Sequence, residues 1–319
     1  MTSPPALWTI VLAAGEGTRL RPLTRLLHDE ELPKQFAMIQ PGQSLLQSTI
    51  ERTLQFCPAE RTIVVVAEDR ADIARSQLHR YGSIEVVVQP RNLGTGPGIL
   101  LPLMHVAARD PDAVVAIVPS DHFVKDSQPF AETVRTAVQA AQRENALILI
   151  GAVPDHAETE YGWIVPSGGA SESSSAVLRF HEKPHGHLAG RLLRSGGLWN
   201  TFLMVGSVEQ LQLLAEKHLP EHSREFAAYR AALAAASGAR LLAAKYARMT
   251  SADFSRDVLE NAAGLRVIPL RPCGWSDWGT PRRVLSSLRG SADFAALVDL
   301  IRAKTQRDPS AGFAELVEL

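Results

Sequence analysis

The chain is poor in several features that define whole classes of protein. Its 319 residues include only two cysteines, Cys57 and Cys273, so no disulfide framework is implied. The net charge of −1 gives no broad attraction to nucleic acid or to an anionic membrane, although a local basic pocket is still allowed. No apolar run is long enough to cross a bilayer, and Met1 to Leu7 lacks the pattern of a secretory signal. We therefore expect a cytoplasmic protein with no nucleic-acid partner and no membrane partner, and homo-oligomer formation stays open.

What the chain does contain, over its first 150 residues, is an alternation of apolar runs and amphipathic segments. Continuous Val/Ile-rich runs are typical of buried parallel strands. Such strands are predicted at Trp8–Leu12, Thr62–Ala67, Ile84–Val88, Val114–Val118 and Ala146–Ile150. Helical spacing of apolar residues predicts helices at Ser44–Phe56, Pro97–Ala108 and Pro129–Arg143. The alternation favours an α/β fold with a doubly wound, mostly parallel sheet.

The pattern becomes less regular after Gly151. Further strands are predicted at Tyr161–Val165, Ala176–His181, Thr201–Val205 and Leu265–Leu270. Helices are predicted at Glu209–Lys217, at Glu225–Ala235 with Gly238 as its stop, from Thr280-Pro281 through Leu288, and at Ala292–Lys304. We therefore expect one domain over residues 1–288, with a nucleotide half at about 1–150 and a sugar-binding half at about 151–288, followed by a helical extension over 289–319.

A glycine-rich turn follows the first predicted strand directly. It reads Leu12-Ala13-Ala14-Gly15-Glu16-Gly17-Thr18-Arg19, and Pro33-Lys34 comes about one loop later. Glycines let backbone N–H groups approach an anion, and the two cations can neutralise a polyphosphate. The combination indicates a nucleoside triphosphate site, while a turn with glycines for geometry alone stays open.

Two familiar phosphate loops do not fit this turn. A Walker loop requires Gly-Lys-Ser/Thr, which does not follow Gly17. A dinucleotide fingerprint requires a third glycine, where this chain has Leu20, at the start of an unbroken helix. Pro22 is expected to interrupt any helix that begins near Arg19, so we predict an irregular segment before Lys34.

Two aspartates are candidate metal ligands. Asp121 follows the Val114–Val118 strand, so it should lie at the carboxyl edge of the sheet, where ligands bind in open α/β folds. A carboxylate there suits Mg²⁺, a hard cation that takes oxygen ligands. Asp277, between Trp275 and Trp278, is the second candidate. From the residues alone, Asp121 can instead cap the next loop, and Asp277 can equally be a turn residue.

Taken together, LAAGEGTRLRPLT…LPKQF resembles the signature of the sugar-1-phosphate nucleotidyltransferases, L-A-G-G-x-G-T-R-L-x-P-L-T/S…P-K. Gln35-Phe36, Ser44–Gln47 and Pro119–His122 are most similar to the mannose-1-phosphate guanylyltransferase branch. The resemblance covers residues 8 to about 285. It implies a Rossmann-like nucleotidyltransferase fold, Mg²⁺ as cofactor, and transfer of a nucleotidyl group from GTP or another NTP to a sugar-1-phosphate. About 30 residues remain beyond it, so the additional isomerase domain of some guanylyltransferases is not expected.

The resemblance also implies roles for individual residues. The implied catalytic residues are Arg19, Lys34 and Asp121, and the implied metal ligands are Asp121 and Asp277. The implied nucleotide-binding positions are Leu12, Ala13, Ala14, Gly15, Gly17, Thr18, Gln89, Gly94 and Thr95. The implied sugar-phosphate-binding positions are Gly162, Glu182, Lys183 and Asn200.

The chain departs from the family pattern at several positions. Ala14 replaces the first glycine of the family pair, Phe202 takes the place of a glycine in the Trp-Asn-Ser-Gly-Met-Phe segment, and Leu26–Leu32 is longer than usual. Residues 28–31 are interpreted as a solvated loop. His181, His185 and His187 suggest a metal site, but the glycine and prolines around them favour a mobile loop.

Two other functions therefore stay open. One is the same reaction with dTTP or UTP and glucose-1-phosphate. The other is a weakly catalytic homologue that binds nucleotide sugars and regulates a partner enzyme.

Overall fold

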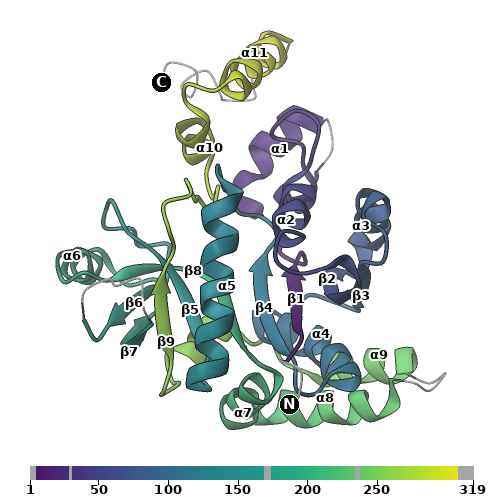
Figure 1. The fold of residues 1–319 in the computed structure, drawn as a ribbon. Helices are drawn as coiled ribbons and strands as arrows, with labels where there is room; N and C mark the ends of the chain where they lie inside the picture. The colour runs from purple at the N-terminus through teal and green to yellow at the C-terminus, as the bar shows by residue number, and fades with distance from the viewer. Residues whose placement is uncertain (1–4, 29–30, 169–173, 234–237, 308–319) are drawn as a thin grey trace.

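A computed structural model describes residues 5–28, 31–168, 174–233 and 238–307 (Figure 1). Within these ranges a nine-stranded sheet runs in the order β3-β2-β1-β4-β8-β5-β9-β7-β6. The strands are β1 (Leu7–Leu12), β2 (Thr62–Ala67), β3 (Glu85–Gln89), β4 (Val114–Pro119), β5 (Ile148–Ala152), β6 (Trp163–Pro166), β7 (Ser175–His181), β8 (Leu198–Ser207) and β9 (Arg266–Pro269).

The sheet is mixed, with a parallel half and a largely antiparallel half. Strands β3, β2, β1 and β4 are parallel, and Leu12 at the end of β1 lies opposite Pro119 at the end of β4. Strand β8 then pairs antiparallel with both β4 and β5, while β5 and β9 are parallel. The carboxyl ends of β1 to β4 therefore meet at one edge, where the connecting loops can form a binding site.

Helices cover both faces of the sheet. They are α1 (Arg21–His28), α2 (Leu45–Thr53), α3 (Ala71–Leu78), α4 (Thr95–Arg109), α5 (Ser127–Glu144), α6 (Gly186–Arg194), α7 (Val208–His218), α8 (Pro220–Ala232), α9 (Gly238–Arg248), α10 (Pro281–Leu288) and α11 (Ala292–Arg307). Because side chains alternate along a strand, Ile10 packs on the face covered by α4 while Val11 packs against α2 and α3. Helix α5 covers the second face over β4, β5 and β8 (Figure 1). The predicted doubly wound α/β architecture is confirmed.

Three predictions about local structure were wrong, each at a proline or a glycine. Pro22 does not interrupt a helix but lies in the first turn of α1, where its missing N–H and fixed φ are tolerated. Gly238 does not end a helix but is the first residue of α9. The segment around His185 and His187 is not a loop throughout, because His185 caps α6 and His187 lies in its first turn. Of residues 28–31, Asp29 and Glu30 lie outside the described residues.

The C-terminal helices pack on the domain rather than apart from it. Figure 1 shows α10 and α11 near α1. Leu297 and Ile301 of α11 share a buried cluster with Leu20, which directly precedes α1, and with Leu23 in the first turn of α1. Helix α10 begins as expected, with Thr280 as N-cap and Pro281 in the first turn. Across the described ranges, no helix combines the length and apolar character that a bilayer crossing would require.

Candidate functional site

The glycine-rich turn is held open by side chains that bind its carbonyl groups. Gln35 Nε2 donates to the carbonyl oxygens of Ala13 and Gly15, at 3.0 and 2.6 Å. Asn92 Nδ2 donates to the Ala14 carbonyl at 3.2 Å. The Ala13 N–H donates to the Val65 carbonyl at 2.9 Å, so the N–H groups that could bind an anion are those that follow Ala13 in the turn. Gln35 therefore has a structural role in addition to its place in the family signature.

A cavity of about 470 Å³ adjoins this turn. Its walls are the turn itself and the segments that follow β2 and β3, residues 67–70 and 90–92. Each wall therefore follows the carboxyl end of a parallel strand, the usual position of a ligand in an open α/β sheet. The volume is in the ordinary range for small-molecule sites, which is about 300–1,000 Å³.

Lys34 lies at the centre of the predicted catalytic residues. Its side chain is nearly buried, its Nζ lies 3.0 Å from Asp121 Oδ2, and it donates to the Asp277 carbonyl at 2.6 Å. Burial disfavours the Asp121 carboxylate, but the charges of Lys34 and His122 outweigh it and lower the pKa of Asp121. One lysine thus joins two aspartates that are 156 positions apart in the sequence (277 − 121).

Arg19 reaches the same cluster from the glycine-rich turn. Its guanidinium lies 3.6 Å from Asp277 Oδ2 and 3.4 Å from Glu160 Oε2. Arg19, Lys34 and Asp121 also line a second cavity of about 210 Å³ with Gly17. The structure therefore brings together Arg19, Lys34, Asp121 and Asp277 from four separate segments.

Asp277 has partners that the sequence did not predict. Its Oδ1 accepts a hydrogen bond from Tyr161 Oη at 2.5 Å, and Arg283 Nη1 donates to Oδ1 and Oδ2 at 3.0 and 3.1 Å. Burial and the Asp277 charge raise the pKa of Tyr161, so this phenol stays protonated. Arg283 also forms an ion pair with Glu158.

Arg283 and Glu158 were not predicted from the sequence, although one signal was present. Arg283 is in the first turn of α10, where a positive charge is unfavourable beside the helix N-terminus. A cation at that position indicates a nearby carboxylate, and Asp277 lies six residues before it.

The residues with predicted sugar-phosphate roles also lie close together. Asn200 N donates to the Gly162 carbonyl at 2.7 Å, and a Cβ at Gly162 would lie 2.9 Å from Glu182 Oε2. Gly162 is therefore needed for close packing. Burial, with the nearby charges of Asp253 and Glu260, raises the pKa of Glu182 to about 7. Exposed Lys183 follows Glu182 in the left-handed region at φ 45°.

Phe202 has the backbone conformation of a glycine. Its φ is 58°, and it sits where the β5–β8 register shifts between Ile150 and Gly151. The Phe202 N–H donates to Asn200 Oδ1 at 3.1 Å, which ties this conformation to the predicted sugar-binding amide. A bulky side chain in this region is strained, at a cost of about 1–2 kcal/mol.

The predicted base-side residues are partly engaged in packing. Gln89 is buried and accepts from Tyr246 Oη at 3.2 Å, while its Nε2 has no partner within the described ranges. Thr95 Oγ1 accepts from the Phe254 N–H at 2.7 Å. Gly94, at φ 89°, packs so closely that a Cβ would lie 2.5 Å from the Ala252 carbonyl oxygen. Their nucleotide contacts stay a prediction.

The donor set fits a hard divalent cation in part. Asp121 is accessible at the cavity wall and offers carboxylate oxygens, the ligands that Mg²⁺ prefers. Both oxygens of Asp277 instead accept hydrogen bonds from protein donors. Oδ1 accepts two of these hydrogen bonds and Oδ2 accepts one, so a lone pair of Oδ2 is left for a metal ion.

Comparisons with known proteins identify a family and several similar chains. Residues 8–290 match the family described as Nucleotidyl transferase. The chain is 32% identical over 219 residues to an Escherichia coli protein named mannose-1-phosphate guanylyltransferase, covering 66% of this chain and 46% of that protein. It is 31% identical over 275 residues to the xanthan biosynthesis protein XanB of Xanthomonas campestris pv. campestris, covering 85% and 57%.

A solved structure is also similar. The structure from Thermus thermophilus described as a mannose-1-phosphate geranyltransferase has a TM-score of 0.77 and 28% identity, and the match covers 89% of this chain and 80% of that one. The present chain spans about half the length of the curated relatives it matches.

Proposed function

Because the chain belongs to the nucleotidyl transferase family, we propose that it is a sugar-1-phosphate nucleotidyltransferase. It converts a nucleoside triphosphate and a sugar-1-phosphate into a nucleoside-diphosphate sugar and pyrophosphate. GTP and mannose-1-phosphate are the favoured pair, because they are the substrates implied by the name of the E. coli relative and by the Gln35-Phe36 and Pro119–His122 resemblance.

One observation carries this proposal. Lys34 contacts both Asp121 and the Asp277 backbone, and Arg19 approaches the Asp277 carboxylate from the glycine-rich turn. Two cations and two carboxylates around a turn with available N–H groups suit a triphosphate with a bound cation. Burying a lysine charge costs free energy. If the four segments only packed against one another, an apolar side chain at the position of Lys34 would avoid that cost.

The reaction requires positioning more than covalent chemistry. An oxygen of the sugar-1-phosphate attacks the α-phosphorus in line, so a new O–P bond forms as the bond from the α-phosphorus to the bridging oxygen breaks. The electron pair of that bond leaves with pyrophosphate. In this proposal Arg19 and Lys34 stabilise the charge that develops on the phosphates, and Lys183 holds the incoming sugar phosphate. Glu182 and Asn200 bind sugar hydroxyls.

The proposed cofactor is Mg²⁺. Asp121 would hold it, and Asp277 Oδ2 would be the second ligand through its remaining lone pair. When bound, the ion would neutralise phosphate charge and orient the two substrates.

The direct test is pyrophosphate release from GTP and mannose-1-phosphate, measured for Arg19→Ala and Asp121→Ala. Each variant is expected to lose most of its turnover, by about 10²–10³-fold, with an unchanged circular dichroism spectrum. Lys217→Ala is the control, because Lys217 is exposed on α7 and remote in sequence from every predicted site residue. Near-normal turnover in either variant would remove that residue from the mechanism.

A panel of GTP, UTP, dTTP and ATP against mannose-1-phosphate and glucose-1-phosphate tests the choice of substrates.

Two observations support an alternative function. Arg283 donates a hydrogen bond to Asp277, and Phe202 on the sugar side has a positive φ. In that alternative the chain binds a nucleotide sugar and regulates a partner enzyme. A rise in melting temperature with nucleotide but no Mg²⁺-dependent pyrophosphate release would favour it over catalysis.

A further inference from the structure

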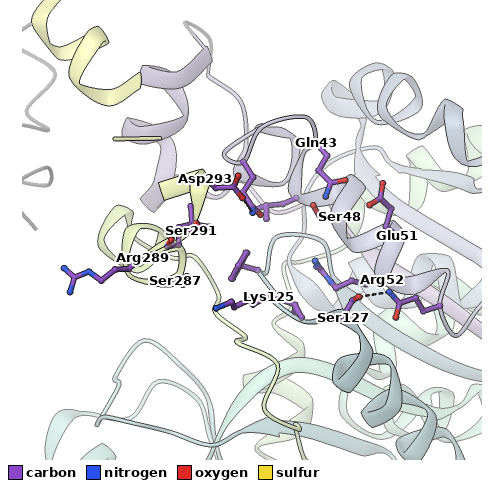
Figure 2. A pocket seen from close by; sticks show the side chains of 17 residues that line it. Gln43, Ser48, Glu51, Arg52, Lys125, Ser127, Ser287, Arg289, Ser291 and Asp293 are labelled. Atoms are coloured by element: carbon purple, nitrogen blue, oxygen red, sulfur yellow. Dashed lines mark hydrogen bonds between the residues drawn. The ribbon is translucent and has the colours of Figure 1, made fainter. Parts of the chain in front are cut away.

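A third cavity lies apart from the residues discussed so far. It has a volume of about 450 Å³ and shares no lining residue with the two cavities of the candidate functional site. Its walls come from α2, from the turn that follows β4 (residues 123–127) and from the junction of α10 and α11 (residues 287–293) (Figure 2). The volume is sufficient for a small molecule.

Arg52 of α2 is the unusual residue of this cavity. Its side chain is only 6% exposed, yet within the described ranges no carboxylate forms an ion pair with it. Arg52 Nη2 donates to Thr49 Oγ1 at 2.7 Å and to the His122 carbonyl at 3.0 Å, whereas Nε is buried without a hydrogen-bond partner. Burial lowers the pKa of Arg52 to about 10, so the guanidinium is still charged at neutral pH.

A buried cation without a counter-ion is costly. The two carboxylates that line the cavity form no ion pair with Arg52, although the Glu51 charge favours the guanidinium and the Phe130 ring lies 5.8 Å from Arg52 Cζ. Glu51 Oε1 accepts from Arg80 Nη2 and Tyr81 Oη, both at 2.9 Å, and Asp293 Oδ2 accepts from Gln40 Nε2 at 2.7 Å.

The remaining polar groups of the cavity are suited to an anion. Lys125 lies on the turn after β4 at the edge of the cavity, and its flexible side chain is directed away from Arg52 in Figure 2, so it would have to turn inward to reach a ligand on Arg52. Ser127 Oγ accepts a hydrogen bond from Gln55 Nε2 at 2.7 Å, so its O–H can donate to a ligand. Arg289 also lines the cavity, but its side chain extends away from the other labelled side chains in Figure 2.

From this arrangement we propose that the cavity binds a small phosphate-bearing molecule, with phosphate oxygens on Arg52, Lys125 and Ser127. Arginine and lysine both bind phosphate through charge-assisted hydrogen bonds. The proposal does not depend on the proposed enzymatic reaction.

The cavity also contacts the segment that carries Asp121. Arg52 donates to the carbonyl of His122, and Thr49 Oγ1 donates to that of Ser120 at 3.3 Å. The arginine that would receive the ligand therefore also holds one of the two residues that flank Asp121. A ligand bound here would stiffen that turn.

The test is calorimetric titration of the full chain with inorganic phosphate and, in a second arm, with ribose 5-phosphate. Lys125→Ala should weaken the binding of phosphate or of ribose 5-phosphate, whichever binds to the unaltered chain, by about 10-fold. Lys217→Ala, which removes an exposed lysine from α7, should leave phosphate binding unchanged, and Arg19→Ala should affect only phosphate that binds at the glycine-rich turn. Tighter binding of ribose 5-phosphate would identify a phosphate ester as the ligand, and equal binding would identify free phosphate.

Arg52→Gln provides the second variant, with its fold checked by circular dichroism and melting temperature. It retains a donor for the His122 carbonyl but removes the charge, so it should lose phosphate binding while remaining folded. If phosphate binding is lost in Arg19→Ala but retained in Lys125→Ala, the anion binds at the nucleotide side and the proposal is wrong. The absence of binding in both arms at millimolar concentrations would overturn it as well.

Discussion

The two regions to which we assign nucleotide binding and sugar binding, called the nucleotide side and the sugar side below, are built in different ways. On the nucleotide side, β1 to β4 are parallel, and their loops place the glycine-rich turn and Asp121 at one edge. On the sugar side, β6, β7 and β8 are antiparallel, with register shifts after Ile150 and Val165. Lys183 and Phe202 there have positive φ, as does Trp278 beside Asp277. The first side uses regular backbone with glycines at the turns, whereas the second holds a strained backbone through contacts made elsewhere.

The largest expected difference between the two sides concerns their lysines. Lys34→Met retains the aliphatic stem but removes the nearly buried charge between Asp121 and Asp277, so kcat should fall about 10²–10³-fold. Lys183 is exposed, so Lys183→Met should mainly raise KM for the sugar phosphate, roughly 10-fold. Steady-state pyrophosphate release with each substrate varied in turn measures both. Equal effects on kcat would contradict the assigned roles.

The second comparison tests close packing on the nucleotide side. Gly94 and Gly42 both have φ 89°, but a Cβ at Gly94 would lie 2.5 Å from the Ala252 carbonyl oxygen, and a Cβ at Gly42 would have nothing within 4 Å. Gly94→Ala should therefore lower the free energy of unfolding by about 2 kcal/mol more than Gly42→Ala does. Urea unfolding of the two variants provides the measurement. Similar losses would show that backbone strain alone accounts for both.

The third prediction uses the raised pKa of Glu182 on the sugar side. This pKa is about 7 in the folded chain and near its ordinary value of 4.5 when unfolded, so the folded state binds the extra proton between these values. The free energy of unfolding should therefore fall as pH rises from about 4.5 through 7. After a discount for partial exposure, the loss is about 1–2 kcal/mol.

Urea unfolding at pH 5 and pH 8 measures this loss. Glu182→Gln cannot titrate and should remove it, and Glu209→Gln, an exposed acid on α7, should not. A wild-type pH dependence that persists in Glu182→Gln would assign the effect to another group.

The smallest predicted effect concerns Phe202. Alanine is normally more stabilising than glycine because it restricts the unfolded chain. At φ 58° the order should reverse, with Phe202→Gly more stable than Phe202→Ala by about 1 kcal/mol. Both variants lose the same packing of the phenyl ring against the core, so their difference isolates the backbone term. A more stable alanine variant would mean that the segment adopts another conformation.

Much of the nucleotide side was predictable because its signals are local. Strand β2 has the predicted bounds, and β1 and β4 each differ from theirs by one residue. Continuous apolar runs specify buried strands, and the glycine-rich turn could be placed directly after β1 without information from the rest of the chain. Thr280 and Pro281 predicted the start of α10 for the same reason.

The sugar side was less predictable. Strand β8 extends from Leu198 to Ser207, well beyond the predicted Thr201–Val205, because its pairing with β4, β5 and β6 extends it. Phe202 has a left-handed backbone conformation, which a bulky side chain disfavours. Long-range pairing overrides local preference at such positions.

Residue order alone was enough to predict the α/β alternation, the glycine-rich turn after β1 and an aspartate at the carboxyl edge of the sheet, since each depends on neighbours within a few positions. The position of Lys34 between Asp121 and Asp277, the hold of Arg283 on Asp277 and the buried guanidinium of Arg52 depend on residues that lie far apart in the chain. The sequence shows which of these side chains are charged, but it does not show which groups they contact. The packing of the sheet and its helices decides which charged groups come together and how much water is excluded around them.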